Sequence, residues 1–168
     1  MNEPIHIKNA GLVLISIYIP MLFERLGLTT DQHFYSISHQ KDAVQYLDYA
    51  VTGIQTIEND ILSLNNILCG LPASEPLQKV ITLTDSEQQL VSGLLEAAIK
   101  NWSILGITSV DGLRETFLIR NGLLLQQEDR WELSVEKGPF DMLIDRIPYS
   151  FSVIKFPWMP LPLHVKWR

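Results

Sequence analysis

Cysteine is almost absent from this sequence, and that scarcity excludes two classes of small protein. The 168 residues include one cysteine, Cys69, so the chain can form no internal disulfide and no cysteine-based zinc cluster. Synthesis in a reducing compartment is therefore permitted.

Charge is scarce as well, and it is mainly of one sign. Charged residues make up 19% of the chain and apolar residues 46%, with a formal net charge of −6. Soluble domains usually contain about 25% charged residues, so we expect this chain to bury additional surface against a partner protein. The absence of a basic stripe argues against a nucleic-acid binder, whose affinity depends on clustered lysine and arginine.

Catalytic and metal-binding motifs are also missing. The chain has no GxSxG, no P-loop, no GxGxxG and no HExxH. His33 and His39 lie six residues apart across an expected loop, which is not a ligand spacing, so we expect no metal and no cofactor. Cys69 is interpreted as a small buried packing residue, the alternative being a nucleophile activated by a histidine. We therefore predict that the protein is not an enzyme.

Two charged groups deserve separate interpretation. Asp111, Arg114 and Glu115 have helical spacing and are expected to form a solvated face, with Asp111 favouring a helix N-terminus. Asp141 and Asp145 lie four residues apart on a short expected helix. Either they are solvated, or they pair with a cation or with a lysine or arginine of a partner.

Against these absences stands one long apolar stretch, residues 9–27 (NAGLVLISIYIPMLFERLG). No charge occurs between Lys8 and Glu24, and apolar residues cover every side of a helix, which predicts burial on all sides. The uncharged run is shorter than the ~18 residues of a membrane-spanning helix and contains Pro20. A secretory signal fits poorly, because the sequence lacks a basic start and a small-residue cleavage site. We predict a buried core helix, kinked or broken before Pro20, and no membrane insertion.

The remaining pattern predicts an α+β fold. Four or five helices surround the buried N-terminal helix, beside a small, largely antiparallel sheet, and strands at both ends allow the sheet to close. No linker or repeat divides the chain, so residues 1–168 are expected to be a single domain. The expected helices are 39–52 (capped by Ser38, stopped by Gly53), 58–69, 84–101 (a Thr84–Glu87 capping box), 110–120 (capped by Ser109) and 140–147. The expected strands are 5–8, 123–127, 130–137, 152–156 and 163–167, with loops at 31–36 and 71–76.

Several segments resemble the tape measure proteins of contractile injection systems, the phage-tail-like particles in which a sheath drives a rigid tube through a target envelope. The resemblance runs in order along nearly the whole chain, and residues 108–115 are its most specific piece. The matching segments are 9–14 (NAGLVL), Pro20, 22–27 (LFERLG), 68–71 (LCGL), 108–115 (TSVDGLRE), 117–118 with Arg120, 131–133 (WEL), 157–159 (PWM) and 163–167 (LHVKW).

This resemblance implies a non-enzymatic structural role, with assembly in the bacterial cytoplasm followed by incorporation into the particle. Its implied partners are the baseplate hub or spike and the inner tube, and a cyclic trimer or hexamer is expected at such a symmetric hub. Family members generally carry this region at the C-terminal end of a longer chain. The region therefore resembles a terminal docking domain that anchors the tape at the hub end of the tube. The alternative is a free-standing adaptor or assembly chaperone that binds another particle protein or a cargo.

The C-terminal corner is the predicted docking site. Trp158 and Met159 lie on a proline-stiffened loop and are expected to form its apolar centre, with Arg114 and Lys166 as charges at its rim. The alternative for Trp158 is that it only caps the sheet.

Overall fold

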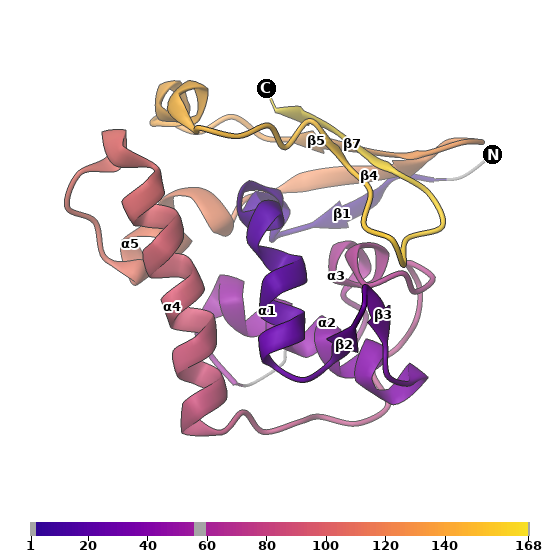
Figure 1. Ribbon diagram of the computed structural model, residues 1–168. Helices are drawn as coiled ribbons and strands as arrows, with labels where there is room; N and C mark the ends of the chain where they lie inside the picture. Colours follow the sequence, from indigo (N-terminus) through magenta and orange to yellow (C-terminus); the bar gives the residue numbers. More distant parts are fainter. Residues whose placement is uncertain (1–2, 56–59, 168) are drawn as a thin grey trace.

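One sheet covers one side of the molecule, and the helices pack against its inner face (Figure 1). The computed structural model describes residues 3–55 and 60–167. The strands of the main sheet are β1 (Ile5–Ile7), β4 (Gly122–Gln126), β5 (Trp131–Val135), β6 (Val153–Ile154) and β7 (Leu163–Trp167). A second, two-stranded sheet joins β2 (Thr29–Thr30) to β3 (His33–Phe34). The α+β prediction is confirmed.

In the described part of the chain, the helical layer contains α-helices, 3-10 helices and one π-helix. The α-helices are α1 (Ile19–Arg25), α2 (Ile37–Thr52), α3 (Ser63–Leu68), α4 (Asp85–Asn101) and α5 (Val110–Leu113). The 3-10 helices are η1 (Ala10–Tyr18), η2 (Ser103–Leu105) and η4 (Asp141–Arg146), and the π-helix is η3 (Arg114–Leu118).

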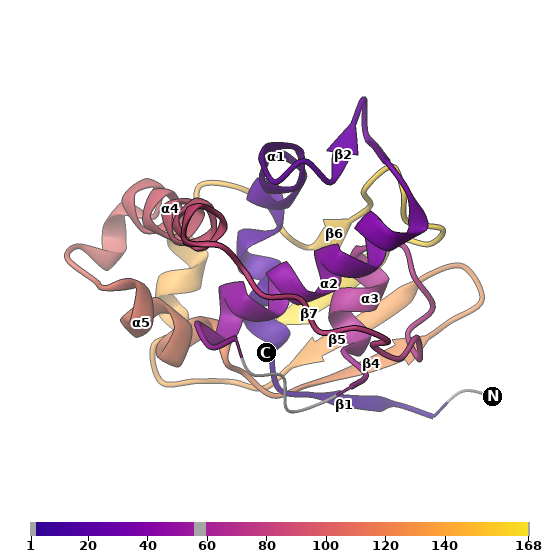
Figure 2. The same ribbon diagram turned by 90° about the horizontal axis from the view of Figure 1, so that it is seen from below.

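The strand order of the main sheet is β1-β4-β5-β7-β6. Three of its four pairings are antiparallel, as expected, but β5 and β7 run parallel, with Leu133 opposite Val165. A parallel pair needs a crossover, which the chain between β5 and β7 supplies through η4 and β6. The sheet does not close, because β1 and β6 lie at opposite edges (Figure 2).

The apolar N-terminal stretch forms the centre of the core, but it is not one α-helix. It runs as the 3-10 helix η1 and changes to the α-helix α1 at Ile19, with Pro20 in the first turn. The predicted break before Pro20 is confirmed, since proline fits the first turn of a helix without losing a hydrogen bond. Burial on all sides was wrong, because Ile17 is 55% exposed and Met21 58% exposed.

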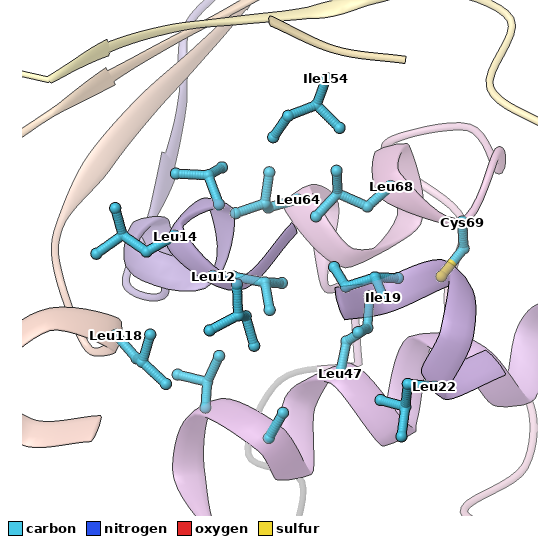
Figure 3. Packing of buried hydrophobic residues seen from close by; sticks show 14 of the residues in the cluster. Leu12, Leu14, Ile19, Leu22, Leu47, Leu64, Leu68, Cys69, Leu118 and Ile154 are labelled. Atoms are coloured by element: carbon cyan, nitrogen blue, oxygen red, sulfur yellow. The ribbon is translucent and has the colours of Figure 1, made fainter. Parts of the chain in front are cut away.

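Close backbone packing explains why glycine occurs at the start of η1. A Cβ on Gly11 would overlap the carbonyl of Phe117 in η3, so η1 and the π-helix touch backbone to backbone. The surrounding core combines side chains from the sheet and from most helical segments, including Leu12, Leu47 and Leu118, all fully buried (Figure 3).

Helix ends with local signals lie close to their predicted positions. Thr84 and Glu87 form the capping box of α4, and Gly53 ends α2 with a φ of 69°. The cap of α2 is Ser36 rather than Ser38, because the Ser36 hydroxyl accepts the His39 N–H. Ser109 caps α5 as predicted.

Three predicted elements were shorter or different. In the described residues, the expected helix 58–69 is shortened to α3, and residues 58–59 of the expected range lie outside the described residues. Ile61, which was expected on the inner face of that helix, is 44% exposed. The expected loop 31–36 contains the turn and second strand of the β2–β3 hairpin. The expected strand 152–156 is reduced to β6.

Candidate functional site

Arg114, predicted at the rim of a docking surface, is instead buried at 7% exposure. Its Nε donates to the carbonyl of Ala50 at 3.0 Å, and its guanidinium lies 5.7 Å from the ring centre of Tyr49. These contacts satisfy a carbonyl in the last turn of α2, where intrahelical donors run out. The expectation that Arg114 points outward was wrong, because the positive guanidinium matches the negative C-terminal end of that helix.

Gly53, which follows α2, makes room for this arginine. A Cβ at Gly53 would lie 2.6 Å from a terminal nitrogen of Arg114. The exposed partner, Asp111, accepts from the same guanidinium at 3.1 Å. The TSVDGLRE segment therefore contributes a structural arginine that joins η3 to α2.

The side chains of the C-terminal corner mainly contact other residues of the same chain. The indole N–H of Trp158 donates to the carbonyl of Leu68 at 2.8 Å, at the end of α3. Its ring packs against Phe23, Phe34 and Phe156 at centroid distances of 5.8, 5.0 and 5.4 Å. Part of the Trp158 side chain still reaches solvent.

Met159 belongs to the interior of this corner. It is 2% exposed, and its sulfur accepts the backbone N–H of Phe156 at 3.2 Å. The expectation that Met159 presents itself to a partner was wrong, because the turn between prolines directs it into the core.

Lys166 is the predicted site residue whose side chain is mostly exposed. Its side chain is 69% exposed and pairs with Glu132 at 3.3 Å, on the outer face of the sheet. The hydrogen bond from Lys166 holds the pKa of Glu132 below its ordinary value. An exposed pair of this kind contributes little to stability.

Asp141 has an internal cation partner, so the hypothesis of a site for an external cation was wrong. It pairs with Arg120 at 2.9 Å and also accepts from the Trp167 indole and the Gly138 N–H, each at 2.9 Å. Burial alone would raise the pKa of Asp141, but these hydrogen bonds outweigh it and hold the pKa below its ordinary value. Asp145 is exposed, as solvation predicts.

Cys69 lies in the core at 0% exposure, and burial raises the pKa of its thiol well above its ordinary value. A thiol in that state is a poor nucleophile. Within residues 3–55 and 60–167, no three histidine, cysteine, aspartate or glutamate side chains are grouped to hold a metal ion.

A groove that sequence reasoning missed lies beside β1. It has a volume of about 640 Å³ and is lined by residues 5–9, by the end of α2 and the start of α3, and by Ile119. Three isoleucines in this lining, Ile54, Ile61 and Ile119, are 59%, 44% and 47% exposed. Ile54 and Ile119 lie outside every expected inner face, whereas Ile61 was expected on one, and no local pattern joins positions so far apart.

Comparison with known proteins gives one result. The sequence model of the family described as contractile injection system tape measure protein matches residues 1–167. Searches of curated proteins and of solved structures gave no significant match. Within the part of the chain that the structure describes, no helix has the length and apolar content to cross a membrane. The matched region covers essentially the whole sequence, so the chain belongs to the contractile injection system tape measure protein family.

Proposed function

We propose that this chain is a non-enzymatic docking component that anchors the tape measure at the baseplate hub or spike end of the inner tube. It acts while tube length is being set during assembly in the bacterial cytoplasm, and it stays within the finished particle. Its partners are the hub or spike and the inner tube proteins. At a symmetric hub it forms a cyclic trimer or hexamer.

The compact shape of the described fold carries this proposal. The longest described helix, α4, has 17 residues and so spans about 25 Å at ~1.5 Å per residue. A globular unit of 168 residues has a radius of gyration of about 15 Å. Even one continuous helix of that length would reach only about 250 Å. A fold of this kind suits attachment better than measurement of a long tube.

Surface chemistry favours contact with protein partners. Large apolar side chains stand exposed at several places, among them Ile107, which is fully exposed on the loop after η2, and Met142, which is 70% exposed on η4. Of the residues predicted for docking, Lys166 and the exposed part of Trp158 remain in the proposal, whereas Arg114 and Met159 do not. Family membership supports a structural role.

Localisation in the particle tests the proposal. The natural protein would carry an epitope tag, and purified particles would be labelled with gold-conjugated antibody and examined by electron microscopy. We expect label at the baseplate end and cross-links to the hub. Absence of the protein from finished particles, with binding only to unassembled components, would refute anchoring and favour the assembly chaperone.

A further inference from the structure

The groove beside β1 combines an unpaired sheet edge with an apolar wall. β4 is the neighbour of β1 on one side, and no other described strand pairs with it. Successive residues of a strand direct their backbone groups to alternate sides, so the sheet leaves backbone donors and acceptors of β1 unused. Such an edge is a template for another strand.

The position of the groove matches that free edge. Its lining includes every residue of β1, and therefore positions on both faces of the strand, while no described residue of β4 contributes. A hollow lined in this way lies along the edge of β1 rather than over one face. Figure 2 shows β1 as the outermost strand on the side away from β6.

The opposite wall of the groove supplies apolar contacts. Ile54 follows α2, and Ile61 and Leu62 precede α3. Both isoleucines are about half exposed, and Ile119 adds a third exposed side chain near β1. A strand added to β1 would direct alternate side chains toward this wall, because side chains along a strand alternate between faces.

Charge indicates what sort of strand fits. Lys8 is exposed in the groove and forms no ion pair with any residue in 3–55 or 60–167. Among the described lining residues, the acidic one is Asp48, which is 9% exposed and already engaged in an interaction. Among the described lining residues, the exposed charge that has no ion-pair partner within 3–55 and 60–167 is therefore the positive one of Lys8, whereas the whole protein has a net charge of −6.

We propose that β1 and this groove bind an extended segment of a partner protein, which adds a strand to the sheet edge. The segment carries apolar residues at alternate positions and an acidic residue opposite Lys8. Main-chain hydrogen bonds to β1 supply affinity, and the isoleucine wall selects the apolar side chains, as in other cases of strand addition. This inference builds on the proposed docking role and names the chemistry of the partner.

The first test uses a fluorescein-labelled peptide of eight residues that alternates valine with serine and ends in two aspartates. Fluorescence anisotropy would measure its affinity for the whole protein. Ile61→Glu should weaken binding at least tenfold, and Lys8→Glu at least fivefold at low salt. Val153→Glu is the matched control, because Val153 is 54% exposed at the opposite edge of the sheet, and it should leave affinity unchanged.

Backbone methylation of the peptide separates strand addition from simple apolar binding. N-methyl groups at one set of alternate residues should abolish binding, whereas methyl groups at the other set should be tolerated. Equal binding by both methylated peptides, no binding by the unmodified peptide, or equal losses for Ile61→Glu and Val153→Glu would overturn the proposal. A protein that forms dimers, and loses them on Ile61→Glu in sedimentation, would also overturn it by showing a second copy in the groove.

Co-purification with the hub distinguishes the failure of this inference from failure of the docking role. If wild-type and Ile61→Glu proteins retain the hub equally, the groove is not the contact and the docking role stands. If the peptide binds as described but wild-type protein retains no hub or tube protein, strand addition stands and the docking role fails.

Discussion

Replacing Arg114 should destabilise the protein rather than weaken its contacts with a partner. The side chain is buried and binds the end of α2, 64 residues away in the sequence. Arg114→Ala removes the Nε donor and leaves the carbonyl of Ala50 without this hydrogen bond. Arg114→Lys keeps the charge but loses the planar fork of donors.

The contacts set the expected size of the effect. A hydrogen bond from a charged group contributes about 1.5–3 kcal/mol, and the Nε bond to Ala50 is well formed at 3.0 Å. The approach to the carbonyl of Tyr49 is 3.5 Å and adds little. Asp111 is 83% exposed, so its ion pair adds at most about 0.5 kcal/mol. We expect a loss of about 2–4 kcal/mol for Arg114→Ala and about half of that for Arg114→Lys.

Urea unfolding followed by circular dichroism measures this loss. With a slope of ~2 kcal/mol/M, Arg114→Ala should lower the midpoint by about 1–2 M. Asp111→Asn is the matched control and should change stability by under about 0.5 kcal/mol. An Arg114→Ala protein as stable as this control would show that the guanidinium does not cap α2, and the rim assignment would have to be reconsidered.

Three further changes probe the core, the acid response and the C-terminal corner. Ile15 is 2% exposed, so Ile15→Ala should lower the free energy of unfolding by about 2–5 kcal/mol. Ile17→Ala should lower it by under about 0.5 kcal/mol, because Ile17 is mostly exposed. Equal urea midpoints for the two variants would contradict the burial described. The pKa of Asp141 is lower in the folded protein than its ordinary value of 3.8. The contribution of Asp141 to folding stability is therefore fully present above pH 3.8 and is lost as the pH falls through the folded pKa. Asp141→Asn should therefore cost about 2 kcal/mol at pH 7, and its deficit relative to wild type should shrink in melts below pH 4; a deficit independent of pH would refute the ion pair. Trp158→Phe should lower the free energy of unfolding by about 1 kcal/mol through the lost indole hydrogen bond, and Trp158→Ala should lower it by about 3 kcal/mol. Unchanged melts together with lost hub binding would show instead that Trp158 anchors the hub protein.

Features fixed by neighbouring residues were accessible from the sequence. The capping box at Thr84 and the stop at Gly53 depend on groups within one turn, and both were placed correctly. The β4–β5 hairpin followed from alternation across a short turn. The burial of Leu12 followed from an uncharged run. In each case the physical cause lies within the segment that shows the pattern.

Features that depend on residues far apart in the chain could not be predicted from the sequence. The spacing of Arg114 is that of a solvated helix face, and nothing near it reveals a helix end from elsewhere in the chain. The parallel pairing of β5 with β7 depends on how the crossover folds, not on either strand. Met159 was placed on the surface because prolines suggest an exposed loop, yet the turn directs its side chain inward. The β1 groove likewise joins four parts of the chain, namely β1 with the residues after it, the end of α2, the start of α3 and Ile119.

The long reach from β1 to β4 has a consequence for synthesis on the ribosome. Ile5 pairs with Leu124, so the first strand has no sheet to join until most of the chain has been translated. At roughly 5–20 residues per second, β1 and the apolar segment after it wait for several seconds before their partners emerge. During that time both edges of β1 are unpaired, and an unpaired apolar strand is prone to aggregate. The nascent chain should therefore depend on holding factors, and faster translation of residues 10–120 should raise the soluble yield.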